Sequence, residues 1–138
     1  MKTITKKWLD YAAADYQVAK VLLNDGKKLG AAYQAAVFHC HQSIEKMLKA
    51  VLTEQGRDVV KIHNLVRLMI LTEVPFPANI ETIVSDLNPH YIPPRYPDLD
   101  FAPQFSFTYN LKNTTHLIHQ TNLVIIWLEK KISSLSKK

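Results

Sequence analysis

Cysteine and long apolar runs are both scarce in this sequence of 138 residues, and each scarcity excludes a class of protein. The single cysteine, Cys40, cannot form a disulfide within the chain, which fits a reducing compartment. No apolar run reaches the roughly 18 residues that a membrane-spanning helix needs. The N-terminal segment carries lysines but lacks the apolar centre of a secretion signal. We therefore expect a cytoplasmic protein with no membrane partner.

Familiar catalytic and cofactor motifs are also missing. The sequence has no Walker loop, no G-x-G-x-x-G, no G-x-S-x-G and no H-E-x-x-H. His39 and His41 stand two residues apart, which on a helix separates their side chains by about 200° and prevents them from sharing a metal. His116 and His119 have a workable spacing, but no cysteine or carboxylate lies close to them in sequence. We expect neither a metal nor a cofactor.

The charge balance is mildly basic, with 17 lysines and arginines against 12 acidic residues. The lysines gather at the two ends of the chain, where they either keep helix ends solvated or attract nucleic acid or an acidic partner. No basic stripe interleaved with aromatic residues decides between the two interpretations.

Glycine is the third scarce residue. Its three positions, Gly26, Gly30 and Gly56, separate segments whose apolar residues recur every three or four positions, as in a helix. No segment shows the alternation with a period of two that marks a strand. The expected helices are residues 8–25, 30–55, 62–74, 78–87 and 105–135. We therefore predict one all-α domain over residues 1–138, an up-and-down antiparallel bundle of about five helices.

The last predicted helix has an unusually wide apolar surface. One stripe consists of residues that repeat every seven positions: Leu111, Ile118, Ile125 and Ile132. A second stripe lies on a neighbouring side and consists of Leu117, Val124 and Trp127. One partner helix does not need so wide a surface. We infer that this helix packs inside the bundle and also at a subunit interface.

The second predicted helix carries the densest polar pattern. His41, Glu45 and Lys49 follow one another at steps of four and share one face, with Gln42 beside them. This face is either a solvated charged surface or a polar cluster that lines a groove. Cys40 belongs to the apolar face of the same helix, which favours a core position over a nucleophilic role.

Asp15 falls on the apolar stripe of the first helix, where an unpaired buried carboxylate would be costly. Lys49 and Arg95 are candidate partners, and the alternative is a half-exposed position at the edge of the stripe. His63 begins the run HNL near the start of the third predicted helix, where packing is the expected role, with capping or a place near the groove as alternatives.

A proline-rich segment, residues 89–99, contains four of the seven prolines and interrupts the helical pattern. Prolines fix the backbone and extend the residue before them, so Arg95 and Tyr96 are held stiffly. Arg95 either pairs with Asp15 or Glu45 across the helices, or binds a phosphate while Tyr91 or Tyr96 stacks on a base.

In their order and spacing, these features resemble the HEPN family, small helical domains of bacteria and archaea, over nearly the whole chain. The resemblance rests on Asp15, on the run HQSIEKMLKAVL with Gln42, Glu45, Lys46 and Lys49, on HNL at His63, and on RYPD at residues 95–98. It implies an antiparallel helical bundle that forms a homodimer. It also implies nucleotide binding, and a minimal nucleotidyltransferase as partner in a toxin–antitoxin pair. Some branches of the family are metal-independent ribonucleases, with an arginine followed four to six residues later by a histidine at the dimer groove.

The sequence departs from that ribonuclease motif. Leu99, Asp100 and Phe101 stand at the required distance after Arg95, and none is a histidine. Arg57 and His63 have a spacing of six, but this arginine lies in a predicted turn after the second helix, so we interpret the match as accidental. Metal-free RNA cleavage needs a group that accepts the 2′-hydroxyl proton. His90, five residues before Arg95, is the nearest substitute.

These observations lead to one hypothesis and two rivals. We expect a non-catalytic HEPN-type homodimer that binds a nucleotide, a minimal nucleotidyltransferase or both. The expected groove residues are Asp15, Gln42, Glu45, Lys49, Arg95 and Tyr96. The first rival is a divergent metal-independent ribonuclease that uses Arg95 with His90 or with a histidine of the other subunit, and RNA would then be its substrate. The second is a purely structural dimer whose polar cluster only specifies packing.

Overall fold

The structure is a computed structural model, and it describes residues 1–91 and 107–138. In this part of the chain the elements are α-helices and one short 3₁₀ helix, η1. In chain order they are α1 (Thr3–Asp25), α2 (Ala31–Glu54), α3 (Leu65–Leu71), α4 (Ala78–Leu87), η1 (Asn88–Tyr91) and α5 (Leu111–Ser136). The predicted all-α bundle is confirmed.

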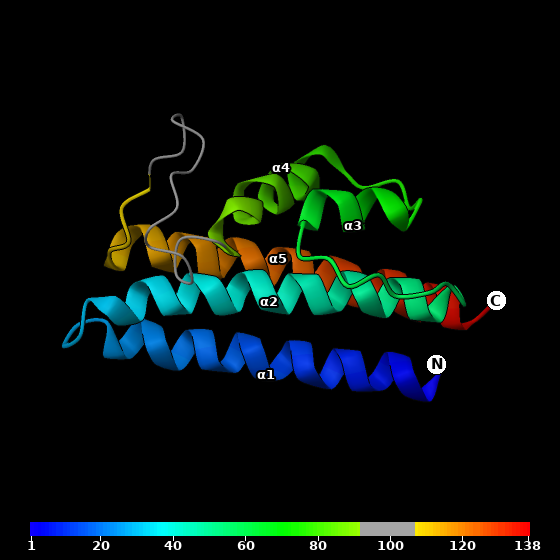
Figure 1. The fold of residues 1–138 in the computed structure, drawn as a ribbon, viewed down its shortest axis with the longest axis horizontal. Helices are drawn as coiled ribbons and strands as arrows, with labels where there is room; N and C mark the ends of the chain where they lie inside the picture. Colours follow the sequence, from blue (N-terminus) through cyan, green and yellow to red (C-terminus); the bar gives the residue numbers. More distant parts are fainter. Residues whose placement is uncertain (92–106) are drawn as a thin grey trace.

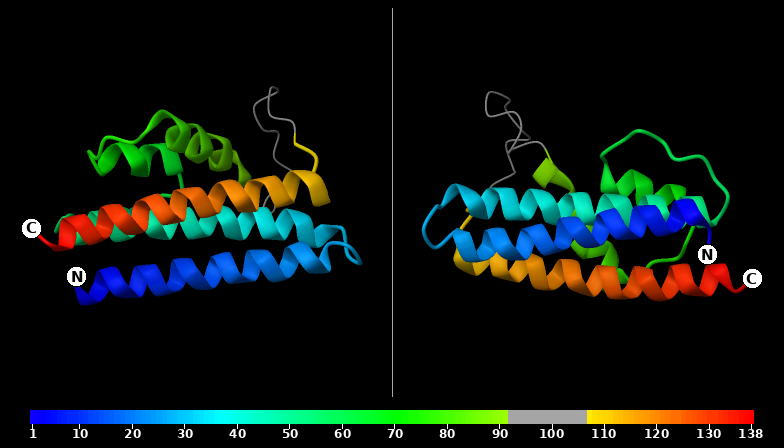
Figure 2. Two further views of the ribbon diagram at one scale, coloured as in Figure 1. Left: turned by 180° about the vertical axis from the view of Figure 1, so that it is seen from behind. Right: turned by 90° about the horizontal axis from the view of Figure 1, so that it is seen from below.

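The three long helices α1, α2 and α5 lie side by side, and α3 and α4 cover α2 and α5 on the side away from α1 (Figure 1). α1 runs antiparallel to α2, whereas α5 runs in the same direction as α2, because the segment from α3 to η1 returns the chain to the end where α2 begins. Seen from below, α1 lies in front of the line along which α2 and α5 contact each other (Figure 2). α2 is the central helix, since it contacts every other helix of the described chain.

Local chemistry explains where these helices begin and end. Asn64 and Asn110 are N-cap residues whose side-chain oxygens accept hydrogen bonds from the backbone N–H three residues later. These caps make α3 and α5 begin later than the sequence predicted, at Leu65 and Leu111. Pro77 is the N-cap of α4, which spans the predicted residues. The predicted start of the last helix at residue 105 lies outside the described residues, but residues 107–110 of that prediction are described and are not helical.

The core forms between α2 and the inner face of α5. Ile44, Leu48, Leu128 and Ile132 are among its fully buried side chains. Cys40 is also fully buried, as predicted, and burial raises the pKa of its thiol to about 12, so it is not a thiolate nucleophile. No described helix combines the length and apolar character needed to cross a bilayer.

The apolar repeat of α5 is only partly used inside this chain. Ile118 and Ile132 are buried, whereas Leu111 remains 44% exposed. Leu123 and Ile126 are likewise exposed. The predicted packing of this helix inside the bundle is confirmed. Its predicted role in a subunit interface remains a prediction.

Candidate functional site

Most of the predicted groove residues meet on one side of α2, between α1 and the segment that contains His63 and Tyr91. We call this surface the α2 strip. Its members are Asp15, His39, Gln42, Glu45, Lys46, Lys49, His63 and Tyr91.

Glu45 is the centre of the strip. One carboxylate oxygen, Oε1, lies 2.7 Å from Nδ1 of His63, and the other, Oε2, lies 3.5 Å from Nζ of Lys49. The side chains of Glu45 and Lys49 are only 5% and 8% exposed. The alternative of a solvated charged face is therefore wrong, because these two charges are withdrawn from water and depend on each other. The ammonium of Lys49 also lies 5.7 Å from the centre of the Trp8 ring.

Asp15 is paired, as its position required, but not with Lys49. Its carboxylate contacts Nζ of Lys46 and lies 2.9 Å from Nδ1 of His39. The expected Lys49 partner is wrong because α1 and α2 are antiparallel, which brings Lys49 level with Trp8, two turns of α1 before Asp15. The other expected partner, Arg95, lies outside the described residues.

His63 and Tyr91 form the far edge of the strip. Their rings stack with centroids 4.3 Å apart and planes 15° apart, and the ring of Phe38 lies 6.5 Å from that of Tyr91. The side chain of His63 remains 45% exposed. His63 therefore does more than the packing role predicted for it, since it also binds Glu45.

His41 lies beneath this edge, and its burial was missed in the sequence. His41 is fully buried, and the centre of its ring lies 5.6 Å from the centre of the Tyr91 ring. Its Nδ1 accepts a hydrogen bond from the side-chain amide of Gln42. Its Nε2 has no hydrogen-bond partner among the described residues. Burial lowers the pKa of His41 to about 3, and the nearby imidazoles of His90 and His63 contribute in the same direction. Its spacing with Glu45 and Lys49 placed it on the polar face of the helix, and that spacing gives no signal of burial.

The two remaining predicted groove residues, Arg95 and Tyr96, lie outside the described residues. Tyr91, the last described residue before them, belongs to the strip. His90 points elsewhere: it is 2% exposed, and its Nδ1 forms a 2.8 Å hydrogen bond with the hydroxyl of Tyr109. Burial lowers the pKa of His90 to about 4.

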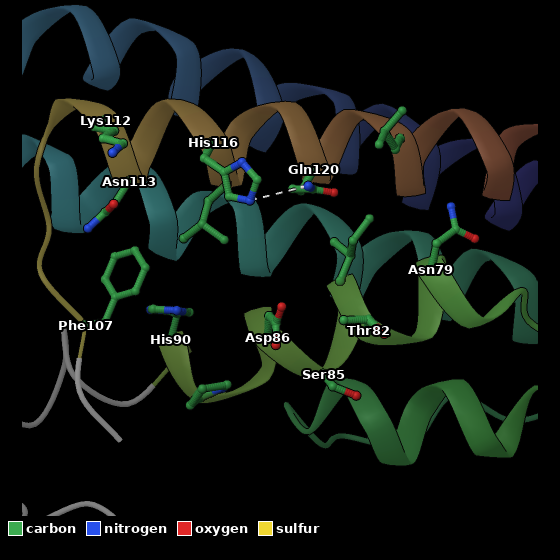
Figure 3. A pocket seen from close by; sticks show the side chains of 14 residues that line it. Asn79, Thr82, Ser85, Asp86, His90, Phe107, Lys112, Asn113, His116 and Gln120 are labelled. Carbon is green, nitrogen blue, oxygen red and sulfur yellow. Dashed lines mark hydrogen bonds between the residues drawn. The ribbon is translucent and has the colours of Figure 1, made fainter. Parts of the chain in front are cut away.

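A separate cavity of about 970 Å³ lies between α4 and α5. Asp86 of α4 and His116 of α5 stand on opposite walls, and Phe107 and His90 close one end (Figure 3). Lys112 also lines it. Nothing in the sequence indicated this cavity, because its walls come from segments about 30 residues apart that no periodic pattern connects.

The described part of the chain contains no cluster of side chains suited to hold a metal ion. No three histidine, cysteine or carboxylate side chains come together there as metal ligands. His116 instead interacts with Gln120, with 3.4 Å between Nε2 of each side chain.

Comparison with known proteins gives one family and two solved structures. The model of the HEPN domain family matches residues 5–131. The crystal structure of ST0689, an archaeal HEPN homologue, is 25% identical with a TM-score of 0.71, covering 96% of this chain and 99% of that one. The crystal structure of TT1696 from Thermus thermophilus is 24% identical with a TM-score of 0.76, covering 94% and 99%. No curated protein matches the chain.

Proposed function

Because this chain belongs to the HEPN domain family, we propose that it is a non-catalytic HEPN subunit that binds a nucleotide at the α2 strip. It does so as a homodimer, in a two-gene module of toxin–antitoxin type whose other component is a minimal nucleotidyltransferase. The observation that carries the proposal is the combination, on one strip, of lysine ammonium groups with stacked aromatic rings.

The charges of the strip support anion binding. Each carboxylate is already neutralised by a neighbour: Asp15 contacts Lys46, and Glu45 lies between Lys49 and His63. The strip therefore carries no excess negative charge, and Lys46, whose side chain is 23% exposed, is the ammonium group that a phosphate can reach. The half-exposed imidazole of His63, supported from behind by Tyr91, offers a flat surface on which a base can stack.

The state of His90 supports a non-catalytic role. It was the nearest substitute for the missing proton acceptor, but it is buried and bound to Tyr109. A general base must reach the proton that it removes, and this imidazole does not face the strip. Arg57, the arginine whose spacing to His63 fits the ribonuclease motif, lies 2.5 Å from a carboxylate oxygen of Glu73.

Nucleotide binding is tested by thermal unfolding with AMP, ATP and GTP at millimolar concentration. A ligand at one hundred times its dissociation constant stabilises the folded state by about 2.7 kcal/mol, an easily measured shift. We expect Lys46→Gln, at the more exposed of the two ammonium groups, to remove the ligand-induced shift and Lys130→Gln, on the exposed face of α5, to keep it. Absence of any shift with all three nucleotides refutes nucleotide binding at this strip.

The homodimer and the partner need separate measurements. Light scattering coupled to size-exclusion chromatography gives the mass of the particle against the 15.8 kDa of one chain. Co-expression with the product of the adjacent gene, followed by purification through a tag on one component, tests the nucleotidyltransferase partner. The mass of a monomer in the first experiment refutes the homodimer. An adjacent gene that does not encode a nucleotidyltransferase refutes the proposed partner.

A divergent ribonuclease is the second candidate, and the pair of Glu45 and His63 favours it. A nearly buried carboxylate 2.7 Å from Nδ1 orients the imidazole and leaves Nε2 of a half-exposed ring available as a base. Cleavage of RNA that Arg95→Ala and His63→Gln both abolish, while His116→Gln keeps it, would establish this candidate. Circular dichroism must show that each variant remains folded.

A further inference from the structure

The cavity between α4 and α5 is distinct from the α2 strip and shares no residue with it. It lies on the other side of η1: His90 faces the cavity, whereas the next residue, Tyr91, belongs to the strip. Its volume of about 970 Å³ falls at the upper end of the range typical of small-molecule sites.

Residues of opposite charge line the two walls of this cavity. Asp86 stands on the α4 wall, and Lys112 and His116 stand one turn apart on the α5 wall (Figure 3). Neither Asp86 nor Lys112 forms an ion pair with any residue that the structure describes. Both residues are exposed, so they lie at the rim of the cavity, where a ligand that offers both charges can replace the water around them.

Apolar side chains line the cavity between the two charged walls. Ile83 and Leu117 are 7% and 6% exposed and form the floor. Phe107, whose ring packs at 4.6 Å edge-on against His90, closes one end (Figure 3). Asn113 and Gln120 add amide groups along the α5 wall.

We propose that this cavity binds a free α-amino acid with an aromatic or branched apolar side chain. The ammonium group binds Asp86, the carboxylate binds Lys112 with His116 beside it, and the side chain covers Ile83 and Leu117 next to Phe107. A nucleotide fits the charges less well, because its phosphates bring at least two negative charges towards Asp86 and meet only one ammonium group on the opposite wall. This ligand is independent of the nucleotide proposed for the α2 strip.

The test is a titration followed by the backbone amide signals of the isotope-labelled protein, with L-phenylalanine and L-leucine as the probes. We expect saturable shifts confined to residues of α4, η1 and the first half of α5. Two matched analogues separate the charges: 3-phenylpropionate lacks the ammonium group, and phenethylamine lacks the carboxylate. Each is expected to bind about tenfold more weakly than phenylalanine, the loss expected for one hydrogen bond between charged groups.

Variants complete the test. Asp86→Asn should weaken phenylalanine binding about tenfold without weakening the binding of 3-phenylpropionate, which has no ammonium group. Lys112→Gln should weaken phenylalanine binding about tenfold without weakening the binding of phenethylamine, which has no carboxylate. Asp10→Asn and Lys130→Gln remove exposed charges elsewhere and should change nothing. The proposal is overturned if neither amino acid shifts the α4 and α5 signals, if the analogues bind as well as phenylalanine, or if AMP alone produces these shifts.

Discussion

Two buried histidines should make this protein markedly less stable in mild acid. His41 is fully buried and His90 is 2% exposed, and burial lowers their pKa values to about 3 and about 4 from the ordinary 6.5. Between those values and pH 6.5 the unfolded chain takes up protons that the folded chain does not bind. Acid therefore favours the unfolded state, and stability rises with pH until it levels off above pH 6.5.

The magnitude follows from the size of these shifts. At pH 5 an unfolded histidine is almost fully protonated, whereas both imidazoles stay neutral in the folded state. The free energy of unfolding falls by about 2 kcal/mol for each of them, or about 4 kcal/mol together, relative to pH 8. A small domain has a total stability of about 5–15 kcal/mol, so this loss is a large fraction of it.

Urea unfolding at pH 8 and pH 5 measures the effect directly. The useful quantity is the difference between the two pH values within each variant, because the carboxylates contribute equally to all variants. We expect His41→Gln and His90→Gln each to reduce that difference by about 2 kcal/mol, even if they are less stable at both pH values. His116→Gln, on the exposed side of α5, should leave the difference unchanged. If His41→Gln shows the same pH dependence as the parent protein, this account of its burial is wrong.

Two stability predictions follow from packing, both read from chemical unfolding. A Cβ at Gly26 would collide with the Tyr33 ring, so Gly26→Ala should cost about 1–3 kcal/mol, while Gly30→Ala, with open space around it, should cost nothing or stabilise slightly. Leu128→Ala in the core should cost about 3 kcal/mol, and Ile126→Ala, 42% exposed, less than about 1 kcal/mol. Equal costs within either pair would show that the helices pack differently.

The candidate site was partly predictable, and the errors have a common cause. Gln42, Glu45 and Lys49 were placed on one face from their spacing alone, and they do lie on one strip. The partner of Asp15 was wrong because helical periodicity says which face a residue occupies but not which turn of another helix lies opposite. The only sequence signal for the true partners of Asp15 was the spacing of His39 and Lys46. They stand seven residues apart, which places both on the side of α2 that faces α1.

The sequence by itself determined the helices and the family. Apolar periods of three to four residues, scarce glycine and bracketing prolines define helices such as α2 and α4, since these are properties of neighbouring residues. Only the tertiary structure decided that Glu45 and Lys49 are buried and that His41 is buried against the ring of Tyr91. It also decided that α4 and α5 enclose a cavity. Those facts depend on the register and separation of helices distant in the chain, and no local pattern of residues encodes them.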